Sequence, residues 1–236
     1  MNYFFYLTYA TFFIPLLVFL FNYKKNKDLS ARVIFAYVIY SILNEVVLFL
    51  LRDNRTPGTE KIEAGFVWSF TVFEFFFLSF FLYLTLTKKS NKRALLIGAI
   101  VFAVTAFLNL FANIKGARNI EVFDTIPVTV SALTLIIFCI VYLFEKIQSP
   151  EIEFIYAGSN FWIIIGIMIY FSGTFFLFLQ YSELTDKEQE SFWIINWFCI
   201  LLKNILFAIA FYLPSDKSQS SISKSDVDIS LLRELD

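Results

Sequence analysis

The residues "NFWIIIGIMIYFSGTFFLFLQ", Asn160 to Gln180, form a long apolar run that contains no charged side chain. An α-helix rises about 1.5 Å per residue, and the hydrocarbon layer of a membrane is roughly 30 Å thick, so about 20 apolar residues are enough to cross it. This run therefore predicts one transmembrane helix.

Runs of the same kind recur along the chain of 236 residues, of which 58% are hydrophobic and 32 are phenylalanine. The sequence predicts an all-α fold with seven transmembrane helices, because the runs are too long for strands and lack the alternating pattern of a membrane barrel. The predicted spans are Tyr3–Tyr23, Ala31–Leu51, Ala64–Thr87, Ala94–Asn113, Asp124–Phe144, Asn160–Gln180 and Ser191–Leu213. Residues 1–213 thus form one transmembrane domain, and the serine-rich, charged residues 214–236 are predicted to be a disordered tail.

The basic residues are unevenly shared between the two sides of the predicted bundle. The first, third and fifth linkers together with the tail carry 12 lysines and arginines, whereas the other side carries 6. Cytoplasmic loops hold the excess of positive charge, so we expect the N-terminus outside and the tail in the cytoplasm. The composition, rich in phenylalanine, isoleucine, lysine and asparagine, is typical of a bacterial protein and indicates the cytoplasmic (inner) membrane.

Several kinds of chemistry have no residues to support them. The chain contains no histidine, the commonest metal ligand and general base, and its two cysteines, Cys139 and Cys199, both lie within predicted spans. No glycine-rich phosphate loop and no GxSxG motif is present. We therefore expect no metal, and an intramembrane enzyme is the least favoured class. We also expect no nucleic-acid partner.

One lysine stands inside the last predicted span, in "FCILLKNILFAI", Phe198 to Ile209. From the helical rise, Lys203 lies about 18 Å below the outer end of its span, Glu74 about 15 Å and Glu45 about 9 Å below theirs. A charge at this depth costs several kcal/mol unless a partner stabilises it. The depths predict that Lys203 pairs with Glu74, with Glu45 and Asn44 nearby; pairing with Glu45 is the alternative.

Two carboxylates and one ammonium leave one formal negative charge, so either one glutamate is protonated or the site holds a cation. Polar residues at helical spacing on the other spans are expected to face the same interior. The candidate site residues are Asn44, Glu45, Glu74, Asn109, Asn196, Lys203 and Asn204. They form either a purely structural network or, as intramembrane charges more often do, a ligand, ion or proton site.

Two further segments receive simpler interpretations. Gly166, Tyr170 and Gly173 share one face of the sixth span, and small residues of this kind predict close helix packing rather than binding. The last residues, "DVDISLLRELD", belong to a solvated tail or to a peptide that docks on a cytoplasmic protein partner.

The phrases "FWIIIGIMIYFSGTFFLF" and "WFCILLKNILFAIAF" resemble uncharacterised seven-helix membrane proteins of Bacteroidetes-type bacteria, which implies a membrane location and at most a sensory or regulatory role. The topology alone is similar to that of SWEET and PQ-loop transporters. A lysine in the middle of the last helix is similar to that of microbial rhodopsins, and this similarity implies retinal on Lys203 with Glu74 as counter-ion. The chain departs from the rhodopsin pattern, because Cys199 stands where an acid is expected.

From these observations we expect a multi-pass protein of the bilayer with a buried Lys/Glu site and a sensory or partner-binding function, and without a cofactor. The alternatives are a transporter of a small solute or of ions coupled to protons, and a retinal-binding protein.

Overall fold

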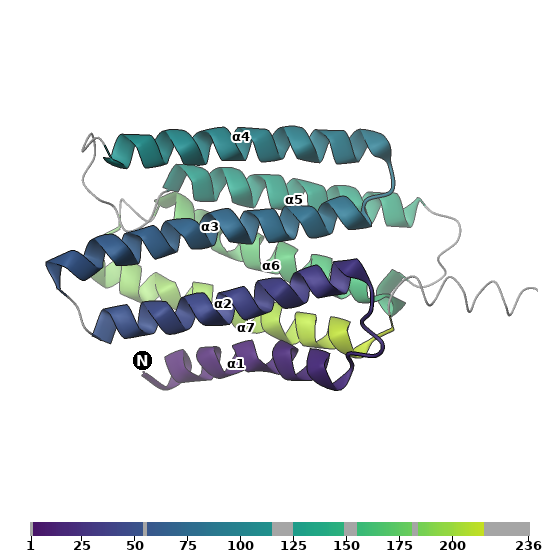
Figure 1. Cartoon of the computed structure of the whole chain (residues 1–236), viewed down its shortest axis with the longest axis horizontal. Coiled ribbons are helices and arrows are strands. Elements are labelled where there is room, and N and C mark those ends of the chain that lie inside the picture. Colours follow the sequence, from purple (N-terminus) through teal and green to yellow (C-terminus); the bar gives the residue numbers. More distant parts are fainter. Residues whose placement is uncertain (1, 54–55, 115–124, 149–154, 181–183, 215–236) are drawn as a thin grey trace, which may run out of the picture.

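The computed structural model describes the chain except for residues 1, 54–55, 115–124, 149–154, 181–183 and 215–236, and its described part consists of helices without strands (Figure 1). The helices are α1 (Asn2–Phe21), α2 (Leu29–Asp53), α3 (Pro57–Thr85), α4 (Lys89–Ile114), α5 (Thr125–Ile147), α6 (Ser159–Gln180) and α7 (Asp186–Tyr212), with a short 3₁₀ helix, η1 (Ile155–Ala157), before α6. The predicted all-α class is confirmed for these residues. The predicted tail lies outside the described residues, apart from Pro214.

Six of the helices, α2 to α7, are long and apolar enough to cross a membrane. The protein is therefore a multi-pass helical membrane protein. In α1 the described apolar stretch covers Ala10–Phe21, which is shorter, so a seventh span stays a prediction, as does the direction in which the bundle crosses the membrane.

Helices α3, α4 and α7 begin several residues before the apolar runs that predicted their spans. Thr56 caps α3, its backbone N–H donates to the Thr59 hydroxyl at 2.7 Å, and Pro57 occupies the first helical position. At the start of α7, the hydroxyl of Thr185 donates to the carboxylate of Glu188 at 2.7 Å, and the backbone N–H of Thr185 donates to it at 3.0 Å. These two bonds hold the pKa of Glu188 below its usual range. Polar first turns of this kind are helical because their caps stabilise them. Hydropathy detects only the apolar part of a helix, so it does not predict these turns.

The start of α4 is capped from another helix. The carboxylate of Glu145, on α5, accepts hydrogen bonds from the backbone N–H and hydroxyl of Thr87, both at 2.6 Å, from the N–H of Lys88 at 3.2 Å and from the amide of Asn91 at 2.6 Å. The first turn of α4 itself contains no acidic residue. A carboxylate at a helix N-terminus satisfies unpaired N–H groups and favours the helix dipole. We call this contact the Glu145 cap.

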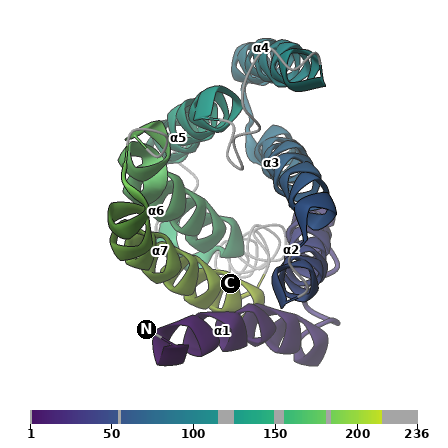
Figure 2. The same cartoon turned by 90° about the vertical axis from the view of Figure 1, so that its left-hand side faces the viewer.

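Six of the helices form a closed ring. Each of α1, α2, α3, α5, α6 and α7 packs against the next, and α7 closes the ring on α1. Figure 2, viewed along the bundle, shows this arrangement with α4 standing apart from it. Helix α4 packs on α3 and α5 from outside, and it is the least buried of the six long apolar helices.

The ring has two ends, which we name by their residues. The basic end holds the connections from α1 to α2, α3 to α4 and α5 to α6, and the N-terminal end holds the beginning of α1. The exposed lysines and arginines of the basic end are Lys24, Lys25, Lys27, Arg32, Lys88, Lys89 and Arg93. This asymmetry is the one that the positive-inside argument uses.

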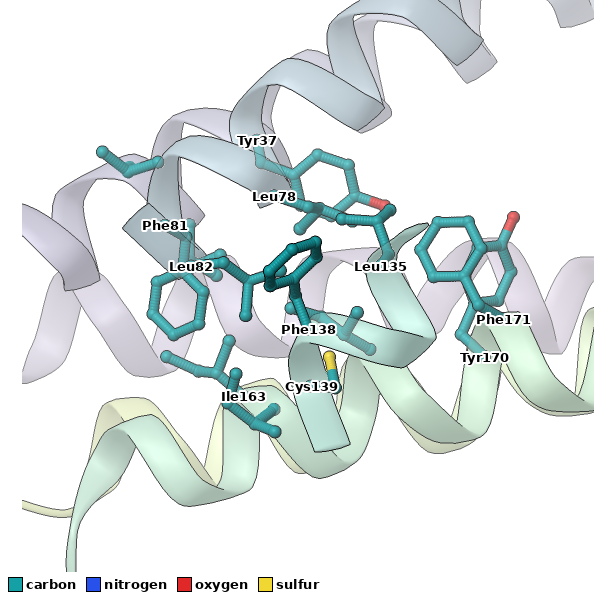
Figure 3. Close-up of a cluster of buried hydrophobic side chains, with 14 of the residues drawn as sticks. Tyr37, Leu78, Phe81, Leu82, Leu135, Phe138, Cys139, Ile163, Tyr170 and Phe171 are labelled. Carbon is teal, nitrogen blue, oxygen red and sulfur yellow. The ribbon is translucent and has the colours of Figure 1, made fainter. Parts of the chain in front are cut away.

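The interior near the basic end is packed with apolar side chains. Leu78, Phe81 and Leu82 of α3 meet Leu135 and other residues of α5, with Ile163 of α6 beside them (Figure 3). All of these side chains are fully buried, as is Phe207 of α7. This half of the ring is closed by its own side chains.

Candidate functional site

A charged bridge crosses the interior of the ring. The ammonium of Lys203 (α7) donates a 2.6 Å hydrogen bond to the hydroxyl of Tyr37 (α2), which donates in turn to Oε1 of Glu74 (α3), also at 2.6 Å. The ammonium lies 3.8 Å from the same carboxylate oxygen. Lys203 and Glu74 are 2% and 7% exposed. The pairing of Lys203 with Glu74, predicted from depth, is therefore present in the structure, and it runs through a tyrosine.

Two aromatic rings complete the surroundings of the lysine. The ammonium lies 4.0 Å from the ring centre of Tyr170, on α6, and 5.1 Å from that of Tyr37. A cation over an aromatic face is attracted to it, more strongly where water is excluded. The bridge, which we define as Lys203, Tyr37, Glu74 and Tyr170, thus joins four ring helices and explains how a lysine remains inside an apolar helix.

The bridge separates two different halves of the ring. On the side of the basic end the apolar packing described above fills the interior. On the side of the N-terminal end, no side chain of α3 from Ala64 to Phe73 is buried, although these residues make almost three turns of a ring helix. Every face of this part of α3, including the face toward the ring, is therefore at least partly accessible.

Most of the buried side-chain polar atoms without hydrogen-bond partners lie in this same half, whereas Oδ1 of Asn26 and Oγ of Ser79 lie toward the basic end. Neither amide atom of Asn44 has a hydrogen-bond partner, nor does Oδ1 of Asn196 or Nε1 of Trp68, and all of these atoms are buried. Asn44 is 4% and Asn196 6% exposed. Buried polar groups in proteins are nearly always hydrogen-bonded, because leaving one unpaired costs free energy. These atoms are therefore available to something other than the described side chains and backbone.

The remaining predicted residues fall in different places. Glu45 is half-buried and interacts electrostatically with both Lys203 and Glu74. The amide of Asn204 donates to the hydroxyl of Thr11, on α1, at 3.1 Å, so it ties α7 to α1. Asn109 is buried on α4, which packs outside the ring, so it does not lie on a ring helix with the other candidates. Whether these residues bind a ligand or an ion stays a prediction.

Sequence reasoning missed two members of the bridge. Tyr37 has a signal, since it lies on one helical face with Ser41, Asn44 and Glu45. Tyr170 was predicted to be a packing residue beside Gly166 and Gly173. That packing exists as well: a Cβ at Gly173 would come 2.5 Å from the sulfur of Cys199, and one at Gly166 would come 3.0 Å from the ring of Phe207. The close approach of α6 and α7 is consistent with the position of the Tyr170 ring against Lys203.

The arrangement offers hydrogen bonding and charge rather than nucleophilic or metal chemistry. Within the described ranges, no three His, Cys, Asp or Glu residues are grouped as metal ligands. The chain of donors from Lys203 through Tyr37 to Glu74 has one carboxylate at its end, and each partner lies on a different helix. A molecule that competes for any of these groups would change how the helices are held together.

Comparisons of the chain with protein-family models, curated proteins and solved structures found no match.

Proposed function

We propose that the protein is a membrane sensor that binds a small polar solute inside the ring, between the bridge and the N-terminal end. The observation that carries this proposal is the contrast between the two halves of the ring. The half at the basic end is filled by fully buried apolar side chains, whereas in the other half α3 has no buried side chain between Ala64 and Phe73, and the amides of Asn44 and Asn196 have buried atoms without partners. A solute that enters from the N-terminal end would reach Lys203 and stop there.

The bridge connects such a site to the C-terminal end of the bundle. Lys203 lies on α7, which ends at Tyr212, shortly before residues 215–236. Near this end, the fully buried Asn26 donates a 2.7 Å hydrogen bond to the carbonyl of Phe211. A change at Lys203 therefore acts on a helix whose last turn is held by the connection between α1 and α2. We propose that this last turn passes the signal to a cytoplasmic protein partner, with the N-terminus outside the inner membrane.

The proposal can be tested through the position of the end of α7. Spin labels on Tyr212→Cys and Lys89→Cys, both at exposed positions of the basic end, report the distance between α7 and α4. Cys139 and Cys199 are buried and leave the labels site-specific. Breaking the bridge by Lys203→Met or Glu74→Gln is expected to shift the distance distribution. Ile209→Ala, an exposed position on the same helix, is the control and leaves it unchanged.

Other outcomes would favour other functions. Unchanged distances in both bridge variants would contradict a sensor in which Lys203 controls α7. Uptake of a solute into liposomes that is lost in Glu74→Gln would favour a transporter. The closed state of such a transporter would have the same structure as the one described above. Visible absorbance that disappears in Lys203→Met would favour retinal bound at this lysine.

A further inference from the structure

Two buried residues with unpartnered side-chain atoms, Asn44 and Asn196, lie at one level of the ring. Asn44 is seven residues from Tyr37 on α2, and Asn196 is seven residues from Lys203 on α7. Seven residues make about two helical turns, so each asparagine lies on nearly the same face as the bridge residue of its helix, roughly 10 Å closer to the N-terminal end. We call Asn44 and Asn196 the amide layer.

The amide layer offers donors and acceptors together. Nδ2 of Asn44 is a donor, whereas Oδ1 of Asn44 and Oδ1 of Asn196 are acceptors. A simple cation would satisfy the oxygens and leave the N–H groups unpaired. An anion would do the reverse, and it would also approach Glu74 and Glu45, which interact electrostatically with each other. Only a molecule with both kinds of group satisfies the whole layer.

The bridge adds a second restriction on charge. Lys203 is already compensated by the Tyr37 hydroxyl, the Glu74 carboxylate and the Tyr170 ring. A charged ligand would lose its hydration on entering this buried site, and this loss costs free energy. The Lys203 ammonium would not offset that cost, because it is already engaged by its own partners. Accepting the sensor function proposed above, we infer that its ligand is a small uncharged molecule with both donor and acceptor groups, such as a carboxamide, bound at the amide layer.

Three probes of similar shape test the charge preference: propionamide, propionate and propylammonium. Thermal unfolding of the purified protein in detergent is followed by tryptophan fluorescence at rising probe concentration. A ligand that binds only the folded state raises the unfolding temperature, by roughly 3 °C or more once its concentration is well above Kd for a protein of this size. We expect this rise with propionamide alone. A rise of similar size with either charged probe, or no rise with any of them, would overturn the inference.

Variants of the layer provide the matched control. Asn44→Leu and Asn196→Leu are expected to remove the effect of propionamide. Without probe, Asn44→Leu is expected to unfold at the same or a higher temperature than the native protein, because it removes two buried atoms that have no partner. An equal rise in the double variant, or marked destabilisation by Asn44→Leu alone, would show that the asparagines are structural and overturn the inference. Binding of a charged probe instead would leave the sensor proposal intact, since that proposal is tested by the α7 distance.

Discussion

At the scale of single residues, Lys203 is kept in the membrane interior by partners from three other helices. The ammonium contacts the Tyr37 hydroxyl, the Glu74 carboxylate and the face of Tyr170. A buried charge is stabilised while all of its partners are present, and it destabilises the folded protein when one partner is lost. The same reasoning explains why the pair is not by itself evidence of high stability.

This reasoning predicts strong coupling between Lys203 and Glu74. Lys203→Met and Glu74→Gln each leave one buried group of the pair without its counterpart, and each is expected to destabilise the protein by about 3–5 kcal/mol, whereas the double variant is expected to be much less unstable than the sum. Thermal unfolding of the four proteins in detergent measures this. Arg52 and Glu63 form the control pair, since they are joined at 2.8 Å while the Arg52 side chain is 46% exposed, and their coupling is expected to be smaller than that of Lys203 and Glu74. Additive losses at Lys203 and Glu74 would contradict the pairing.

The sequence was sufficient to predict this pair and insufficient for the rest of the bridge. Depth along a helix follows from residue number alone, so Lys203 and Glu74 could be placed at one level. The contact of Tyr170 with Lys203 depends on how α6 is rotated against α7, and the spacing of Gly166 and Gly173 indicates a packing face without saying which side chain lies over the ammonium. The spacing of Asn109 likewise does not reveal that its helix, α4, lies outside the ring.

At the scale of helices, α6 and α7 are held close by glycines that leave no room for a side chain. Gly173→Ala would place a methyl group 2.5 Å from the sulfur of Cys199 and is expected to destabilise the protein by about 1–3 kcal/mol. Replacing Cys199 by alanine as well removes the sulfur, so the double variant is expected to recover most of the loss. The free energy of unfolding, measured with denaturant in detergent, checks both.

Gly65 on α3 is the matched control for this prediction. A Cβ at Gly65 would meet nothing within 4 Å, so Gly65→Ala is expected to be neutral or stabilising by up to about 1 kcal/mol. Equal losses at Gly65 and Gly173 would contradict the explanation by the contact between α6 and α7, because a methyl group at Gly65 meets no neighbour and alanine is the better helix former.

Helix existence and helix ends were predictable to different degrees. Each predicted span lies on one of the seven helices, because an apolar run of this length has few alternatives in a membrane. Helices α3, α4 and α7 begin several residues before their predicted membrane spans. Their first turns are polar and depend on caps from Thr56, Glu145 and Thr185, and a cap that comes from another helix, as Glu145 does, leaves no local signal.

At the scale of the whole molecule, the ring has a basic end and an N-terminal end, and the orientation of these ends in the membrane can be measured. Single cysteines at Lys24 and Lys89 are expected to be protected from an impermeant thiol reagent in intact cells, whereas a cysteine at Lys61 is expected to react. All three positions are exposed, and the two native cysteines are buried and serve as the unreactive background. Labelling of Lys24 and Lys89 but not of Lys61 would reverse the orientation, and with it the direction from which a solute enters.

The order of helices around the ring lay beyond the sequence. All helices that follow each other in the chain are neighbours, but α3 also packs against α5, and this contact leaves α4 outside the ring. Neighbour order depends on which faces fit together, and the phenylalanine-rich faces of these spans are too similar to distinguish by composition.

The Glu145 cap has a consequence for biosynthesis. A ribosome delivers α3 and α4 to the membrane before α5 exists, so the first turn of α4 must rely on water and lipid headgroups until Glu145 is made. The main neighbours of α4 are α3 and α5. Its contacts outside the ring are therefore complete only when α5 has been inserted and the Glu145 carboxylate binds Thr87 and Asn91. The fourth helix is thus inserted before its cap is made, and a nascent chain that ends before α5 would hold α4 through α3 alone.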